Sequence, residues 1–160
     1  MKTYIGTKII KAEPMSRGDY NTYRGWTIPA DENPADEGYL VKNLDGYISW
    51  SPKKQFKEAY RAFDEGMNFG HAIELMKQGY KVARKGWNGK GMFIYLSSGY
   101  SINVDDVLRR DLCEYLAKTT KDGIVHINSH IDMKAADGTL VIGWLASQTD
   151  MLAEDWIVVE

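Results

Sequence analysis

Residues 81–96, KVARKGWNGKGMFIYL, decide the fold that we expect for this chain. Two apolar runs flank the pair Asn88-Gly89, and Asn-Gly is a preferred sequence for a two-residue type I′ turn. The stretch therefore predicts a tight antiparallel hairpin. With that turn, one sheet face would carry Val82, Arg84, Phe93 and Tyr95, and the other would carry Ala83, Lys85, Trp87, Met92 and Ile94.

The segments around this hairpin predict short helices and further strands. Asn68 can cap a helix that Gly79 ends, with an inward face of Phe69, Ala72, Ile73 and Met76. Another helix is expected over residues 105–121, with Asp105 as its cap and Gly123 just past its end, because apolar residues recur there at helical spacing. Asp137-Gly138 marks a second hairpin, and the sequence DWIVVE at 155–160 predicts a closing strand. The fold class is thus α+β, an antiparallel sheet built from hairpins with short packed helices.

We expect a boundary near residue 66, which divides the chain into an accessory segment, 1–66, and a second unit, 67–160. The accessory segment is predicted to be small and β-rich, with a hairpin at Asp45-Gly46, both residues taking positive φ. A helix should close it, with Ser51 as N-cap, Pro52 at the first position and a buried face of Phe56, Ala59, Tyr60 and Phe63. The polar stretch 16–37, which contains two prolines, is expected to be irregular.

Length and composition restrict the class of protein. The chain has 160 residues, a formal net charge of −2 and one cysteine, Cys113. A single cysteine excludes internal disulfides and thiolate zinc clusters, and the near-neutral charge argues against a nucleic-acid polymer as partner. Since the chain also lacks a long apolar run, we expect no membrane span and a cytoplasmic location.

Catalytic chemistry is poorly represented in the sequence. His126 and His130 lie in a strand-like run, where four residues span about 13 Å, too far for one metal ion. Cys113 follows Leu112 on a predicted helix and is expected to pack as a small hydrophobe. The sequence predicts no catalytic residue, no metal site and no cofactor, and hence a protein that is not an enzyme.

Binding chemistry is better represented, in two stretches. Residues 84–90 combine three cations with an indole and an amide: Arg84, Lys85, Trp87, Asn88 and Lys90. The cations can bind phosphate, the indole can stack on a base, and the amide can form hydrogen bonds with a base edge. The alternative is a solvated basic hairpin with Trp87 in the core. Residues 144–156 place Gln148, Thr149 and Asp150 between Trp144 and Trp156, where the three polar side chains could contact a ligand. The alternative is a structural role, in which Ser147 or Thr149 caps a turn and Trp156 anchors the last strand.

Two long blocks carry a family resemblance: FGHAIELMKQGYKVARKGWNGKGMFIYL at 69–96 and HIDMKAADGTLVIGWLASQTDMLAEDWIVV at 130–159. Together they resemble the Thoeris anti-defence protein 2 family of phages and prophages. The resemblance implies a sponge that sequesters glycocyclic ADP-ribose without cleaving it, and a homotetramer with pockets at subunit interfaces. It also implies that some members hold cyclic dinucleotides, the signals of CBASS defence, at a separate site.

Ten residues are expected to contact the ligand on this interpretation. Eight come from the two motifs, Lys85 is one of the cations of the hairpin, and Phe93 is added because an interface pocket tolerates a large apolar ring near polar groups: Arg84, Lys85, Trp87, Asn88, Lys90, Phe93, Trp144, Gln148, Thr149 and Asp150. The alternative is a protein-binding or toxin-like phage accessory module that has no small-molecule ligand.

Overall fold

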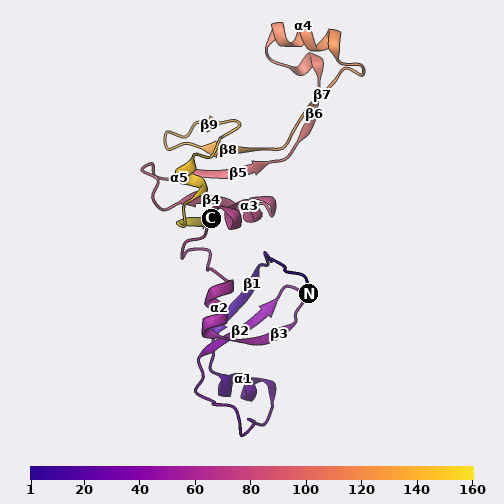
Figure 1. Ribbon diagram of the computed structural model, residues 1–160. Coiled ribbons are helices and arrows are strands. Elements are labelled where there is room, and N and C mark those ends of the chain that lie inside the picture. The colour runs from indigo at the N-terminus through magenta and orange to yellow at the C-terminus, as the bar shows by residue number, and fades with distance from the viewer. The chain divides into compact units, whose positions relative to one another are not determined.

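The computed structural model describes all 160 residues and confirms the α+β class. The chain divides into two compact units, residues Met1–Ala62 and Phe63–Glu160. Figure 1 shows the elements of both, and each unit is described by itself below. No helix is long and apolar enough to cross a membrane.

The first unit is built on a three-stranded antiparallel sheet. Its strands, in the spatial order β1-β2-β3, are β1 (Ile10–Pro14), β2 (Gly38–Asn43) and β3 (Ile48–Pro52). The β2–β3 hairpin lies at Asp45-Gly46 as expected, but only Gly46 has positive φ. Three residues instead of two separate Asn43 from Tyr47, and Asp45 Oδ1 accepts the Tyr47 N–H at 2.9 Å. The side chain of Asp45 thus closes the turn without a positive φ of its own.

The stretch 16–37, expected to be irregular, contains helix α1 (Arg17–Arg24). Ser16 caps it, since Ser16 Oγ accepts the Asp19 N–H at 3.1 Å. Gly25, at φ 68°, ends the helix in the left-handed conformation. The prediction was wrong because the two prolines lie beyond this helix, whereas a serine followed three residues later by an acidic residue favours a helix start.

Helix α2 (Lys53–Ala59) closes the first unit, but not with the predicted boundaries. Ser51 does not cap it, because Ser51 and Pro52 pair with Tyr39 and Gly38 as the last residues of β3. No residue of α2 is fully buried, and Tyr60 and Phe63 lie beyond its end. The helix is held through Phe56, whose ring stacks on Tyr39 with centroids 4.0 Å apart.

The carboxylate of Glu32, which joins the loop after α1 to that helix, makes the stability of this unit sensitive to acid. Arg17 Nε donates to Glu32 at 2.8 Å and Asn21 Nδ2 donates at 3.0 Å, and these bonds lower the pKa of Glu32 to about 2. A lowered pKa stabilises the fold above the ordinary value near 4.5, and this contribution disappears as the pH falls towards 2.

We therefore expect Glu32→Gln to lower the melting temperature of the first unit at pH 7, with a difference from wild type that closes between about pH 4.5 and 2. Thermal unfolding followed across this range measures the difference. The matched control is Glu58→Gln, which removes an exposed carboxylate of α2. A difference in melting temperature between Glu32→Gln and wild type that stays constant down to pH 2 would contradict the lowered pKa of Glu32.

The second unit contains a five-stranded antiparallel sheet in the order β10-β4-β5-β8-β9. Its strands are β4 (Lys81–Arg84), β5 (Phe93–Ser97), β8 (His130–Lys134), β9 (Leu140–Val141) and β10 (Trp156–Val159). The predicted second hairpin is confirmed by the pairing of β8 with β9, and the predicted closing strand is β10, which pairs with β4.

Helix α3 (Phe69–Lys77) packs against this sheet. Asn68 caps it as predicted, accepting the His71 N–H at 3.0 Å, and Gly79 follows its end at φ 89°. Its fully buried residues are Ala72, Leu75 and Met76; Phe69 and Ile73 of the predicted inward face are half-buried. On the sheet, one face supplies the core residues Val82, Ile94, Met133 and Trp156.

The predicted turn between β4 and β5 is wrong. Val82 pairs with Ile94, whereas a two-residue turn at Asn88-Gly89 would pair it with Tyr95. Residues 85–92 instead form a longer loop in which only Gly91 has positive φ. The shift of one residue moves Phe93 and Tyr95 to the face opposite Val82 and Arg84. The start of this loop is held from outside the hairpin, because the N–H groups of Lys85 and Gly86 donate to Asp155.

A two-stranded ribbon continues the β5–β8 pair outwards and carries the third predicted helix (Figure 1). It consists of β6 (Tyr100–Asn103) and β7 (Ile124–Ile127), and at its end lie a single 3₁₀ turn, η1 (Val104–Asp106), and α4 (Arg110–Thr119). The helix is shorter than the predicted span 105–121. Asp105 belongs to η1, and the N-cap of α4 is Arg109. Gly123 takes positive φ and returns the chain to β7.

Candidate ligand-binding site

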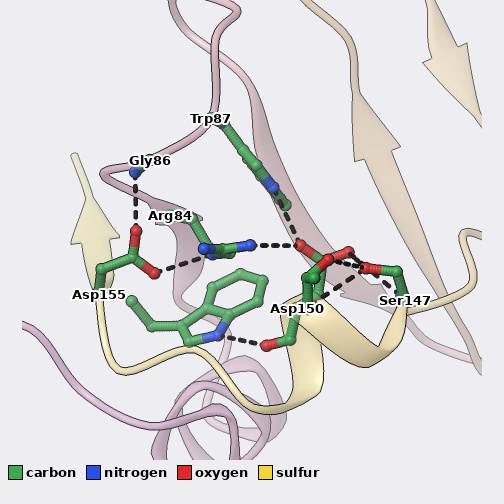
Figure 2. Close-up of polar contacts among 8 residues, drawn as sticks. Arg84, Gly86, Trp87, Ser147, Asp150 and Asp155 are labelled. Atoms are coloured by element: carbon green, nitrogen blue, oxygen red, sulfur yellow. Dashed lines mark hydrogen bonds and ion pairs between the residues drawn. The ribbon is translucent and has the colours of Figure 1, made fainter.

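Arg84 is the centre of the polar cluster formed by the two motifs (Figure 2). It is the last residue of β4, and its guanidinium lies between two carboxylates from the C-terminal part of the chain. Nε donates to Asp155 at 2.8 Å and Nη1 donates to Asp150 at 3.0 Å. The bond to Asp155 and then that to Asp150 raise the pKa of Arg84. The charge of Arg84 is therefore already compensated within the chain.

Asp155 also holds the β4–β5 loop in place. Its Oδ2 accepts the Gly86 N–H at 2.8 Å, and its carbonyl accepts the Lys85 N–H at 3.1 Å. A Cβ at Gly86 would lie 2.8 Å from that carboxylate oxygen, so a glycine lets the backbone approach. Burial opposes ionisation of Asp155, but the bonds from Arg84 and Gly86 outweigh it and lower the pKa of the carboxyl. The loop is thus fixed by an ionised side chain 69 residues away from Gly86 in the sequence.

Asp150 joins the same loop to the short helix α5 (Gln148–Met151). Its Oδ1 accepts Nε1 of Trp87 at 3.2 Å, and its Oδ2 accepts the Ser147 N–H at 3.2 Å. Ser147 Oγ in turn accepts the Asp150 N–H, which completes a capping box. Although burial opposes it, the bonds from Ser147, Arg84 and Trp87 lower the pKa of Asp150. Asp150 therefore sets the orientation of the Trp87 ring.

Three indoles meet beside this network. The Trp87 ring lies edge-on to Trp156 and to Trp144, with centroids 5.4 and 6.1 Å apart. Trp156 is fully buried and its Nε1 donates to the Asp150 carbonyl at 3.1 Å, whereas Trp87 and Trp144 are half-buried. These two partly accessible rings offer apolar faces on which a planar group could stack.

The segment that carries Trp144 rests on a buried carboxylate. Asp132, on β8, accepts the Gly143 N–H at 2.9 Å, and the Trp144 N–H donates to the Ile131 carbonyl at 2.7 Å. His130 Nε2 lies 3.4 Å from the same carboxylate. Gly143, at φ 75°, turns the chain so that Trp144 comes next to Trp87.

The structure brings together only part of the predicted site. Arg84, Trp87 and Asp150 are in direct contact, Trp144 touches Trp87, and Thr149 bonds to Ser147. Lys85 extends to the Asp64 carbonyl. Three further predicted residues have exposed side chains that bond to no other residue: Asn88 and Lys90 in the β4–β5 loop and Gln148 on α5.

Phe93 does not join this cluster. Its register places it on the opposite sheet face from Arg84, where it lines a shallow pocket of about 360 Å³ with Tyr80, Lys81, Tyr95 and Leu140. Lys81 Nζ lies 5.4 Å from the centre of the Phe93 ring. The expectation that Phe93 lies near Arg84 is therefore wrong, because it depended on the two-residue turn.

Sequence analysis missed Asp155 as part of the site and assigned no function to Gly86. One observation could have found Asp155: residues 75–104 contain five cations and no carboxylate, so a half-buried Arg84 needs a distant anion. The alternative interpretation of residues 144–156, in which they have a purely structural role, is also correct in part. Ser147 caps a helical turn, and Trp156 anchors the last strand.

Comparison with known proteins agrees with this geometry. The model of the Thoeris anti-defense 2-like domain matches residues 67–159, and both motifs lie inside that range. Over 93 residues the chain is 41% identical to the Thoeris anti-defense 2 protein of Bacillus phage SP01, an alignment that covers 58% of this chain and 94% of the phage protein. The chain belongs to the Thoeris anti-defense 2-like family, and this membership supports an anti-defence role.

Proposed function

We propose that the chain is a phage anti-defence sponge, which binds a cyclic nucleotide immune signal and keeps it from its effector without cleaving it. The proposed ligand is glycocyclic ADP-ribose, the signal of Thoeris defence. The observation that carries the proposal is the fixed pair of half-buried indoles, Trp87 and Trp144, together with the unpaired Asn88 and Lys90 in the Trp87 loop and Gln148 on α5. Base stacking and charge-assisted bonds to phosphate are the contacts that such groups offer.

The carboxylates of the cluster support binding rather than hydrolysis. A general base needs a carboxylate or imidazole that is free to take a proton, with a pKa near the working pH. Asp150 and Asp155 are both occupied by Arg84, and the pKa of each is lowered. We therefore assign them to holding the Trp87 loop in shape, so that the ligand meets a preorganised surface.

The proposal includes a homotetramer with its pockets at subunit interfaces. The β9 edge of the five-stranded sheet supports it, because exposed apolar side chains continue from this edge strand into the following loop: Leu140, Val141, Ile142 and Leu145. Apolar groups gathered at a sheet edge suit contact with another subunit. Trp144 lies within this segment, so an interface there would border the proposed site.

Cyclic dinucleotides are proposed as further ligands, through which the chain would also block CBASS effectors. The Phe93 pocket supports this part, since it combines three aromatic rings with Lys81 and lies on the sheet face opposite Arg84. A separate pocket predicts that the two ligand classes bind independently. Saturation with one should leave the affinity for the other unchanged.

Calorimetric titration with glycocyclic ADP-ribose tests the proposal, followed by heat denaturation and chromatography of the released ligand. We expect binding and recovery of intact ligand. Altered ligand would indicate an enzyme. No heat with either ligand class would favour the alternative, a protein-binding or toxin-like module.

Lys90→Ala is the sharpest variant for this test, because its side chain makes no bond within the chain. We expect its affinity for glycocyclic ADP-ribose to fall roughly 10-fold or more, as loss of a charge-assisted phosphate bond implies. Lys121→Ala, which removes an exposed lysine beyond α4, is the matched control and should bind like wild type. Equal affinity in the two variants would remove Lys90 from the site.

A further inference from the structure

The helix α4 carries a short apolar stripe that its own chain leaves partly exposed. Leu112 and Tyr115 are 41% and 63% exposed, and Leu108, just before the helix, is fully exposed. The other side of the helix contacts η1, where Cys113 Sγ donates to the Val104 carbonyl at 3.2 Å. Figure 1 shows α4 at the end of the β6–β7 ribbon, away from α3 and the five-stranded sheet.

The stripe has the spacing of a helix–helix seam. Within the helix, Leu112, Tyr115 and Thr119 follow one another at intervals of three and four residues, the alternation of core positions in a coiled coil, and Leu108 lies two residues before the helix begins. Two charged residues flank the same edge of this seam, Asp111 and Lys118. Lys118 makes no ion pair within the chain, and Asp111, paired with Arg109, remains 70% exposed in its side chain.

These charges specify which partner fits. If a second α4 packs antiparallel across a two-fold axis midway between Leu112 and Tyr115, Leu112 meets Tyr115 of the other copy. The flanking positions then place Asp111 beside Lys118 of the other copy, twice by symmetry. A parallel pair would place Asp111 beside Leu116 and form neither ion pair. The seam is therefore complementary to itself in one orientation only.

We propose that α4 is a self-association surface, through which the ribbon ends of two copies pair as antiparallel helices. The proposal does not depend on the nucleotide ligand, since the stripe shares no residue with the Trp87–Trp144 site. A seam of two helical turns buries less than the roughly 1,200–2,000 Å² of a standard interface. We therefore expect a weak contact that depends on concentration and adds one association step to whatever assembly the rest of the chain forms.

Sedimentation velocity of the full chain over a concentration series tests the seam. Leu112→Asp should remove one association step, while Leu44→Asp, which changes an exposed leucine in the β2–β3 turn, should sediment like wild type. Calorimetry with glycocyclic ADP-ribose on the same samples separates this result from the proposed function, because loss of pairing should leave each site intact. A Leu112→Asp variant that associates like wild type would overturn the proposal.

Charge exchange tests the orientation without touching the apolar seam. Asp111→Lys and Lys118→Asp should each weaken self-association roughly 10-fold or more, because each brings like charges together at both flanks. An equimolar mixture of the two variants should associate like wild type, since every flank then joins opposite charges. The double variant D111K/K118D should also recover. Failure of both the mixture and the double variant to recover would exclude the antiparallel pair.

Discussion

Trp156→Ala lowers the free energy of unfolding of the second unit by about 3–5 kcal/mol, the expected cost of removing a fully buried indole. The ring is 0% exposed and lies 5.3 Å from Phe69 of α3 and 5.4 Å from Trp87. Its loss leaves a cavity between helix and sheet and frees the Asp150 carbonyl that Nε1 bonds. Differential scanning calorimetry should show a fall of at least about 15 °C in the melting temperature of this unit.

Trp26→Ala is the matched control for this prediction, since it removes the same side chain from a half-exposed position in the first unit. Trp26 is 51% exposed and packs only at the edge of Tyr20 and beneath the Arg24 guanidinium. We expect a loss of about 1 kcal/mol, confined to the first unit. A comparable loss in both variants would mean that Trp156 does not hold helix and sheet together.

Asp150→Ala should destabilise the second unit by about 3 kcal/mol and abolish ligand binding as well. The substitution removes the capping box of α5, one of the two carboxylates on Arg84 and the acceptor for Trp87. Removing one partner of a largely buried pair leaves the other charge short of compensation, although Asp155 still neutralises Arg84 in part. Urea unfolding measures the first effect and calorimetric titration the second.

Two variants separate the roles of this carboxylate. Ser147→Ala removes the cap alone and should cost about 1 kcal/mol with little change in affinity. Glu154→Ala removes an exposed carboxylate four residues further along the chain and should be neutral within about 0.5 kcal/mol. If Asp150→Ala were as stable as Glu154→Ala, the network around Arg84 would contribute nothing to the fold.

Both predictions assign the central motif residues to the scaffold of the site. The charge of Arg84 is compensated by Asp150 and Asp155, so substitution of Arg84 or Asp150 is expected to act on ligand binding through the position of Trp87. Lys90 and Asn88, by contrast, are exposed and free. Stability measured beside affinity therefore distinguishes the two groups: scaffold variants lose both, and contact variants lose affinity alone.

Local features of the chain could be predicted where they depend on a few neighbouring residues. The cap at Asn68, the end of α3 before Gly79 and the hairpin between β8 and β9 follow from side-chain capping, positive φ and alternation of apolar residues. The cap at Ser16 has the same local origin, but the prolines further along the stretch 16–37 favour a loop and outweighed it in the prediction. Membership in the family could likewise be recognised from the two motifs.

The sequence by itself thus determined the α+β class, the start and end of α3, and the set of cations, indoles and amides available for a ligand. The tertiary structure alone decided which of them meet. Asp155 lies 71 residues after Arg84, and its bonds to Arg84 and Gly86 open the Asn88-Gly89 turn into a longer loop. That shift of one residue moves Phe93 to the other sheet face. A turn preference amounts to a local choice of φ, and a partly buried ion pair formed across the fold outweighs it.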